Sequence, residues 1–310
     1  MIEAAKRLAA AIEAAPYAAR LGFRAGGISD AAANGSVPYA GVLANAQGFI
    51  HGGVAASLSI WSALVAAVAS DRGPAGDLDG PQAIPAASPV SLSISYLAPA
   101  RAELLRASAA VVSRGREIAH VRIDVAGKDA NAVATALVVL RTTRPPAAAT
   151  APSMGEETPF PEEIAGFGDA AERSRPLISP FSQAMGMIVH SYDSNSAVLA
   201  MRRDINSGPT GAVDWGALAA MADTCAALAC LPSIDERMLG SATLSLSAIF
   251  GEPLLAPAIA VGRPVAESGE LKSALVEVGA GNLDAAEKIA GRPAMTACVA
   301  YRFVAARDRS

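Results

Sequence analysis

One segment of the sequence restricts the fold more than any other. Residues 54–70 consist almost wholly of Ala, Val, Leu, Ile and Ser, with one Trp and no charged residue. A helix that is apolar on every side is stable only where it is buried on every side. A second such segment, residues 217–231, contains a single carboxylate, Asp223. The chain therefore has to wrap other elements around two separate central helices.

The segments after each apolar helix alternate apolar and polar residues, which is typical of antiparallel strands with one solvent-exposed face. After the first helix we expect strands at residues 89–97, 103–113, 116–126 and 132–142. After the second helix we expect strands at residues 240–250, 257–266, 271–278 and 293–305. The sequence thus predicts an α+β fold with the order helix, then sheet, in each half.

The segments ahead of each apolar helix are shorter. An alanine-rich amphipathic helix is expected over the first fifteen residues, ending before Pro16. Gly26-Gly27 and Asn34-Gly35 are turn signals and suggest a hairpin between residues 20 and 39. Ahead of the second apolar helix, residues 185–190 and 197–202 are strand-like.

The two halves match with few shifts in register. Gly53 aligns with Gly216 at an offset of 163, the strand endings align at 154, and the last strands align at 161. Insertions and deletions in loops change the offset between repeats in this way. An internal duplication therefore explains the pattern best, and the alternative is two unrelated α+β halves. Proline, alanine and serine without a hydrophobic period indicate a linker. We expect repeat 1 at 1–145, the linker at 146–165 and repeat 2 at 166–310.

Composition excludes several function classes. A formal charge of −4 leaves no basic stripe for nucleic acid, and no apolar run reaches the roughly 20 residues of a membrane span. Three cysteines, Cys225, Cys230 and Cys298, form no even framework and no CxxC pair. The first residues lack the apolar core of a secretory signal. We expect a soluble, cytoplasmic protein with no nucleic-acid partner and no membrane partner.

The strongest local motif is residues 45–53, Asn-Ala-Gln-Gly-Phe-Ile-His-Gly-Gly, which opens the first apolar helix. The N-terminus of a helix presents unpaired N–H groups and a partial positive charge. Glycine there lets a ligand approach the backbone, so the junction can polarise a carbonyl. The alternative is that the glycines only allow tight packing and that His51 is an ordinary capping residue.

Asp223 is the second signal, because its helix offers no polar face for a carboxylate. Burying an unpaired carboxylate costs several kcal/mol, so this side chain needs hydrogen-bond partners or a chemical role. The alternative is a structural aspartate that bonds a neighbouring strand or Thr224.

The two halves are complementary at these positions. With Gly53 aligned to Gly216, the first half has Ile60 where the second has Asp223. The second half has Asp214-Trp215 where the first has its His-Gly helix start. Each half therefore lacks what the other retains.

Helix geometry turns this complementarity into a spatial prediction. Nine helical residues span roughly 13–14 Å, so a carboxylate at that distance cannot reach a carbonyl bound at the start of its own helix. The carboxylate has to come from a second helix. If the repeats pair about a pseudo-twofold axis, Gly52 faces Asp223, and we expect one working site per chain.

These residues resemble the hotdog-fold thioesterases, specifically the PaaI-like branch. The branch has an Asn-x-x-Gly-x-x-His-Gly-Gly loop, then an apolar helix with an acidic residue nine positions after the histidine; residues 45–53 and Asp223-Thr224 match these parts. Residues 91–100 resemble the family's strand that ends in an aromatic residue and a proline, and Ser113-Arg114-Gly115-Arg116 resembles its next hairpin. The resemblance covers nearly the whole chain and implies a double hotdog, in which each repeat wraps an antiparallel sheet around its long apolar helix.

The resemblance also implies roles for individual residues. The Gly52 N–H binds the thioester carbonyl, Asn45 and His51 position the thioester or the water, and Asp223 is the general base or the nucleophile. Further substrate contacts are implied for Gly48, Gly53, Thr224 and Arg116, and for a strand serine or threonine: Ser88, Ser241 or Thr243. For Arg116, a solvated hairpin is the alternative to a contact with CoA phosphates.

The expected function is that of an acyl-CoA thioesterase. The alternative is an acyl-CoA-binding protein without turnover; an enoyl-CoA hydratase is disfavoured because no adjacent Asp–His dehydratase motif is present. The resemblance implies acyl-CoA as the partner and a homo-oligomer, a dimer of double hotdogs. We expect no metal, since no His/Cys cluster has ligand spacing, and no cofactor beyond the CoA of the substrate.

Overall fold

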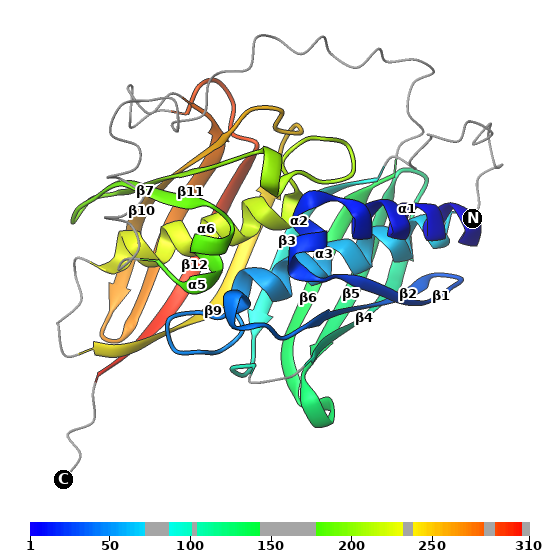
Figure 1. The fold of residues 1–310 in the computed structure, drawn as a ribbon, viewed down its shortest axis with the longest axis horizontal. Helices are drawn as coiled ribbons and strands as arrows, with labels where there is room; N and C mark the ends of the chain where they lie inside the picture. The colour runs from blue at the N-terminus through cyan, green and yellow to red at the C-terminus, as the bar shows by residue number, and fades with distance from the viewer. Residues whose placement is uncertain (72–86, 101–103, 143–177, 232–237, 282–288, 306–310) are drawn as a thin grey trace.

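Two buried helices, α3 (Gly52–Ala69) and α6 (Trp215–Cys230), form the centre of the structure, a computed structural model. A single sheet wraps around both of them (Figure 1). The structure describes residues 1–71, 87–100, 104–142, 178–231, 238–281 and 289–305. This confirms the α+β double hotdog with its two long apolar helices.

The sheet has twelve strands, and all neighbouring strands are antiparallel. Along the sheet their order is β1-β2-β4-β5-β6-β3-β9-β12-β11-β10-β8-β7, so the second half repeats the first in reverse. The first half supplies β1 (Arg24–Ser29), β2 (Ala32–Pro38), β3 (Ser88–Tyr96), β4 (Leu104–Arg114), β5 (Ile118–Ala126) and β6 (Ala132–Arg141). The second half supplies β7 (Met187–Tyr192), β8 (Ala197–Met201), β9 (Met238–Phe250), β10 (Ala258–Ser268), β11 (Leu271–Ala280) and β12 (Met295–Ala305).

A pseudo-twofold axis passes between β3 and β9. Ser93 pairs with Ser247, the residue 154 positions later, and equivalent residues pair with each other only at such an axis. On the outer side of each strand, Leu137 pairs with Ser93 and Cys298 pairs with Ser247. Leu137 and Cys298 differ by 161, so the strand registers agree with the two offsets read from the sequence.

The two central helices approach each other through small residues. A Cβ atom on Gly53 would lie 2.8 Å from the Cα of Ala220, and one on Gly216 would lie 2.8 Å from the Cα of Ser57. Ser57 and Ala220 are themselves 163 residues apart, so the two contacts are equivalent. The N-terminus of each helix therefore lies against the middle of the other helix.

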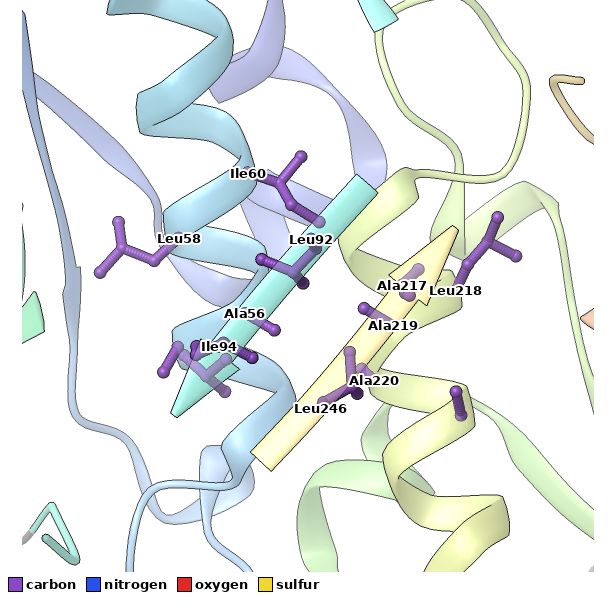
Figure 2. Close-up of a cluster of buried hydrophobic side chains, with 14 of the residues drawn as sticks. Ala56, Leu58, Ile60, Leu92, Ile94, Ala217, Leu218, Ala219, Ala220 and Leu246 are labelled. Atoms are coloured by element: carbon purple, nitrogen blue, oxygen red, sulfur yellow. The ribbon is translucent and has the colours of Figure 1, made fainter. Parts of the chain in front are cut away.

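Apolar side chains fill the space between these helices and the two central strands. Figure 2 shows Ile60 of α3 near Leu92 of β3, and Ala220 of α6 near Leu246 of β9. All four are at most 1% exposed. Full burial of a leucine or isoleucine stabilises the fold by roughly 1.5–3 kcal/mol. The packing ties the two halves into one core and holds the helix N-termini in place.

The strands and long helices lie within a few residues of the predicted ranges, but two short helices were not predicted. The amphipathic helix α1 (Ile2–Ala14) ends before Pro16 as expected, and α2 (Pro16–Leu21) then begins at that proline. Proline fits the first turn of a helix because the N–H it lacks has no partner there. In the second half, α5 (Pro180–Ala184) begins the same way and ends where the strand at 185–190 was expected to start.

The hairpin at residues 20–39 is present, but the predicted turn positions were wrong. The turn lies at Asp30-Ala31, between β1 and β2. Gly26-Gly27 and Asn34-Gly35 lie inside the strands. A Cβ on Gly35 would be 2.6 Å from the Ser62 hydroxyl of α3, so this glycine serves close helix packing and not a turn.

Two further expectations concern the linker between the repeats and the length of the apolar helices. The linker at 146–165, with the repeat boundaries at 145 and 166, lies outside the described residues. Among the described helices, α3 is the one long and apolar enough to cross a membrane by length and composition, and 94% of it is buried inside the protein. Such burial is expected of a core helix.

Candidate active site

The loop ahead of α3 is shaped by one side chain. The Oδ1 atom of Asn45 accepts hydrogen bonds from the N–H groups of Gln47 and Phe49, both at 3.0 Å. Gly48 has a φ of +80°, which favours glycine, and an added Cβ would meet nothing within 4 Å. Asn45 lines the pocket described below, whereas Gly48 is absent from the pocket lining and serves the loop backbone.

His51 caps α3 and leaves one N–H group available. Its Nδ1 atom accepts a hydrogen bond from the Gly53 N–H at 3.0 Å. Burial lowers the pKa of His51, against the opposing effect of Asp223, so the ring is neutral with its proton on Nε2. Within the described part of the chain, no acceptor is hydrogen-bonded to the Gly52 N–H. His51 therefore caps α3, which was the alternative considered for it, and the role of the Gly52 amide stays a prediction.

Asp223, from the middle of α6, faces this helix start. Its Oδ2 atom lies 3.5 Å from Nδ1 of His51. A Cβ atom on Gly52 would lie only 2.9 Å from the same oxygen. The carboxylate of one half thus meets the amide-rich helix start of the other half, as the spacing argument requires.

The other carboxylate oxygen of Asp223 has two hydroxyl donors. Thr243 of β9 donates to Oδ1 at 2.9 Å, and Tyr301 of β12 donates to Oδ1 at 2.5 Å. The Tyr301 hydroxyl also contacts the main-chain oxygen of Asp223. Asp223 is only 3% exposed, and these donors compensate the burial of its charge. Sequence reasoning missed Tyr301 because nothing near it in the chain suggests a site.

Tyr96, at the end of β3, closes the other side of the helix start. Its hydroxyl donates to the main-chain oxygen of Gly52 at 3.0 Å. Burial, and then the charge of Asp223, raise the pKa of Tyr96 well above its usual value, so the phenol remains a donor. Tyr96 was predicted as the aromatic end of a strand, but not as a neighbour of the site.

These groups border a pocket of about 270 Å³. The pocket is walled by the loop before α3, the segment at α5, the C-terminal half of α6, and strands β9 and β12. Its lining is Asn45, Ala46, Gln47, His51, Gly52, Ile178, Ser179, Ser182, Asp223, Thr224, Ala227, Leu228, Leu231, Ser241, Thr243, Tyr301 and Phe303. Polar groups surround its inner end at Asp223, and apolar side chains follow α6 outward.

The short helix α5 connects the two halves at the pocket. Phe181 stacks on the His51 ring with centroids 4.6 Å apart, and its N–H donates to the main-chain oxygen of Ala44 at 3.1 Å. The hydroxyls of Ser182 and Thr224 lie 3.0 Å apart. Thr224 thus lines the pocket while its hydroxyl is bonded within the protein.

Two predicted contact residues lie elsewhere, and these predictions were wrong. Ser88 starts β3, eight residues before Tyr96 and so roughly 26 Å along the strand. Arg116 is exposed in the β4–β5 turn, and the pairing of Ile118 with Arg141, and of Arg141 with Ser88, puts this turn at the same remote end. Because the site is shared, the second half's β9 borders Asp223 and the start of β3 does not. Ser241 and Thr243 of β9 do line the pocket.

The equivalent helix start in the second half keeps the backbone and changes the chemistry. Gly211 has a φ of +78°, as Gly48 has in the first half. Asp214 caps α6 by accepting the Gly216 N–H at 2.8 Å, and Trp61 donates to both its carboxylate oxygens at 3.1 Å. Burial raises the pKa of Asp214 to about 6, against the opposing hydrogen bonds.

Aromatic side chains occupy the place of an open pocket there. Trp61 stands where the first site has Thr224, and it packs against Tyr17 and Phe23 at centroid distances of 5.6 and 5.0 Å. Trp215 stands where the first site has Gly52, and its ring packs edge-on against Phe250. This arrangement agrees with one working site per chain.

Within the described ranges, no group of three or more His, Cys, Asp or Glu side chains is placed to hold a metal ion. The site consists of carboxylate, hydroxyl and main-chain amide groups. Its chemistry is therefore that of a buried base or nucleophile beside a hydrogen-bond donor at a helix N-terminus.

Comparison with known proteins gives a match to one family model over part of the chain, and a fold. Residues 35–141 match the family model of the acyl-CoA thioesterase N-terminal domain. No curated protein sequence matches the chain significantly.

Solved structures resemble the chain over most of its length. A hotdog-fold protein of unknown function from Alicyclobacillus acidocaldarius is 17% identical, with a TM-score of 0.57, covering 88% of this chain and 94% of that one. The tesB protein of Mycobacterium avium subspecies paratuberculosis is 13% identical, with a TM-score of 0.57, covering 97% and 99%. An acyl-CoA thioesterase II from Mycobacterium marinum is 13% identical, with a TM-score of 0.54, covering 89% and 94%. At these identities the likeness shows the fold.

Proposed function

We propose that this chain, a double-hotdog protein whose residues 35–141 match the family model of the acyl-CoA thioesterase N-terminal domain, hydrolyses the thioester bond of acyl-CoA at one composite site. The observation that carries the proposal is the meeting of the Asp223 carboxylate with the helix start at Gly52. Acyl transfer to water needs these two groups: a base or nucleophile, and a donor for the carbonyl oxygen.

In the proposed reaction, the Gly52 N–H donates to the thioester carbonyl oxygen. Negative charge develops on that oxygen as the tetrahedral intermediate forms, and the partial positive charge at the N-terminus of α3 stabilises it. Because His51 accepts the neighbouring Gly53 N–H, the Gly52 N–H is the amide left to bind the carbonyl oxygen. His51 thus acts by shaping the donor site, and Asn45 acts by holding the loop.

Asp223 takes one of two roles through Oδ2. As a general base, it accepts a proton from water while the water oxygen attacks the carbonyl carbon. The C–S bond then breaks, and the proton passes to the departing CoA thiolate. As a nucleophile, Oδ2 attacks the carbonyl carbon itself, CoA leaves, and water hydrolyses the resulting anhydride. Both routes use the same residues around Asp223.

The proposal is tested by thiol release from a panel of acyl-CoAs. We expect turnover by the wild type, and a loss on the order of 1000-fold or more in Asp223→Asn with the fold retained. Asp214→Asn is the matched control, since Asp214 is an equally buried aspartate at the filled equivalent site. Absence of turnover by the wild type on every acyl-CoA would favour the rival, an acyl-CoA-binding protein without catalysis.

The proposal also includes an assembly. Leu137, Ile249 and Leu275 are 42%, 68% and 41% exposed, and strand alternation places them on the outer face of the sheet. We propose that a second copy of the chain covers this face, giving a homo-oligomer such as a dimer of double hotdogs. Light scattering of the purified protein decides this, because a monomer mass of 31.2 kDa would contradict it.

The remaining expectations are also part of the proposal. These are a cytoplasmic location, no membrane or nucleic-acid partner, and no metal or cofactor beyond the CoA of the substrate. Membership of the PaaI-like branch rests on the loop motif at residues 45–53. Because no metal is expected, the thioesterase activity should be unchanged after exhaustive chelation.

A further inference from the structure

We infer that Tyr301 is a positioning residue for the hydrolysis: with Thr243, it holds Oδ1 of Asp223 so that Oδ2 is the oxygen presented to the substrate. The inference rests on the proposed function. It assigns a role to a strand residue that no motif marks.

The two hydroxyl hydrogen bonds of the Asp223 carboxylate go to one of its oxygens. Oδ1 receives both hydroxyl donors, and Tyr301 also contacts the main-chain oxygen of the same residue. Oδ2 is the oxygen next to the Gly52 position and 3.5 Å from Nδ1 of His51. An aspartate held at one side-chain oxygen and at its main chain has little freedom to rotate. Tyr301 therefore determines which oxygen faces the pocket.

The two halves provide an internal comparison. Tyr301 pairs with Thr243 across β12 and β9, and its equivalent Leu140 pairs with Pro89 across β6 and β3. A register shift follows at the same place in both strand pairs, so the backbones correspond residue by residue. The equivalent of Asp223 is Ile60.

All three polar members of this group are thus replaced by apolar residues in the half without a carboxylate. Leu140 and Ile60 are both 0% exposed and pack in the core. The fold itself is therefore satisfied by leucine at the Tyr301 position. A tyrosine there, only 3% exposed, is explained by the carboxylate it contacts.

The phenol of Tyr301 keeps its proton and is available as a hydrogen-bond donor. Burial, followed by the charge of Asp223, raises the pKa of Tyr301 well above its usual value, so it keeps its proton over the working range of an enzyme. A neutral phenol donates one proton, and the Tyr301 hydroxyl lies within hydrogen-bond distance of both Oδ1 and the main-chain oxygen of Asp223. Tyr301 itself takes no part in proton transfer to the substrate.

The test is kinetic and uses substitutions that remove one hydroxyl. In Tyr301→Phe we expect kcat to fall about 10- to 100-fold, the effect of losing a hydrogen bond to a charged group, with KM within about 2-fold of wild type. Thr243→Val is expected to act in the same direction. Thr243→Ser, which keeps the donor, is the matched control and should retain most of the activity.

A double substitution separates positioning from a general structural effect. If Tyr301 acts through Asp223, adding Tyr301→Phe to Asp223→Asn lowers kcat no further. A structural role would lower the residual rate, or the folded fraction, in both backgrounds alike. Wild-type kcat in Tyr301→Phe, or a further fall in the double variant, would overturn the inference.

A crystal structure of Tyr301→Phe keeps this inference separate from the proposed function. We expect the Asp223 carboxylate to rotate away from Gly52 once Oδ1 loses its donor. A carboxylate that stays in place refutes positioning by Tyr301, whether or not the protein turns over acyl-CoA. A rotated carboxylate in a protein without turnover supports the positioning contact and contradicts only the proposed function.

Discussion

At the scale of single residues, two buried aspartates show how position decides the role of a carboxylate. Asp223 and Asp214 are 3% and 4% exposed. Asp214 accepts the N–H of its own helix start and the indole of Trp61, so its lone pairs are used inside the fold. Asp223 lies in the middle of a helix and presents one oxygen to a pocket. Only the second arrangement leaves a carboxylate oxygen available for the proposed role of base or nucleophile.

Asp214 gives a prediction on the pH dependence of stability. Its pKa is raised from 3.8 to about 6 in the folded protein, so between these values the folded state holds a proton that the unfolded state has lost. The stabilisation is fully present below pH 3.8 and is lost as the pH rises through 6. Relative to Asp214→Asn, the wild type should lose about 3 kcal/mol of unfolding free energy from pH 3.8 to above 6. Urea unfolding of both proteins measures this, and parallel pH curves would refute it.

Gly52 gives a prediction on activity. In Gly52→Ala the new Cβ would lie 2.9 Å from Oδ2 of Asp223 and 3.3 Å from the Tyr96 ring, so the carboxylate has to move. We expect kcat/KM to fall on the order of 100-fold, as for other small misplacements of reacting groups. Gly115→Ala is the matched control, because its Cβ meets only Ile118 oxygen at 3.5 Å. Equal activities of the two variants would contradict the close approach.

At the scale of elements, the long helices and the strands could be predicted because their burial leaves a periodic pattern in the sequence. The short helices could not: α2 and α5 have too few residues for a period, and Pro16 was interpreted as an end although it begins a helix. The glycine pairs in the first hairpin looked like turns because helix packing and turns both select glycine.

In the candidate site, too, some residues could be predicted from the sequence and others could not. The meeting of Gly52 with Asp223 could be predicted, since helix length excludes a site within one helix. Tyr96, Phe181 and Tyr301 reach the site only through the packing of distant elements. The predictions for Ser88 and Arg116 failed because these residues were placed by their own half, although the facing half borders the site.

The helix α5 gives a prediction at this scale. Phe181 of α5 contacts the first half of the chain by stacking on the His51 ring. In Phe181→Leu the side chain stays apolar but the stacking is lost, so we expect KM to rise about 3- to 10-fold, in keeping with the strength of an aromatic pair. Phe23→Leu is the control, as Phe23 is equally buried but packs on Trp61 at the filled equivalent site. A similar change in KM in both variants would mean that α5 has no special role.

At the scale of the whole molecule, the pseudo-twofold axis produces two helix starts with the same backbone and different contents. One is open and faces a carboxylate, and the other is capped by Asp214 and filled around Trp61 and Trp215. Each half contributes to the open site, so neither half contains a complete one.

Binding stoichiometry tests this asymmetry. A non-hydrolysable analogue of acyl-CoA, a ketone in which a methylene group replaces the thioester sulfur, should bind with one molecule per chain in calorimetric titration. Aromatic side chains occupy the equivalent position in the other half. The affinity for the analogue should fall in Gly52→Ala and stay unchanged in Asp214→Asn. Two equivalent analogues per chain would contradict the one-site arrangement.

The most direct test is a crystal structure of the protein with that ketone analogue bound. We expect the carbonyl oxygen about 3 Å from the Gly52 nitrogen, with the carbonyl carbon facing Oδ2 of Asp223, directly or through one water. An analogue whose carbonyl lies in another cavity, or whose carbonyl oxygen is bound by groups other than the Gly52 amide, would contradict it.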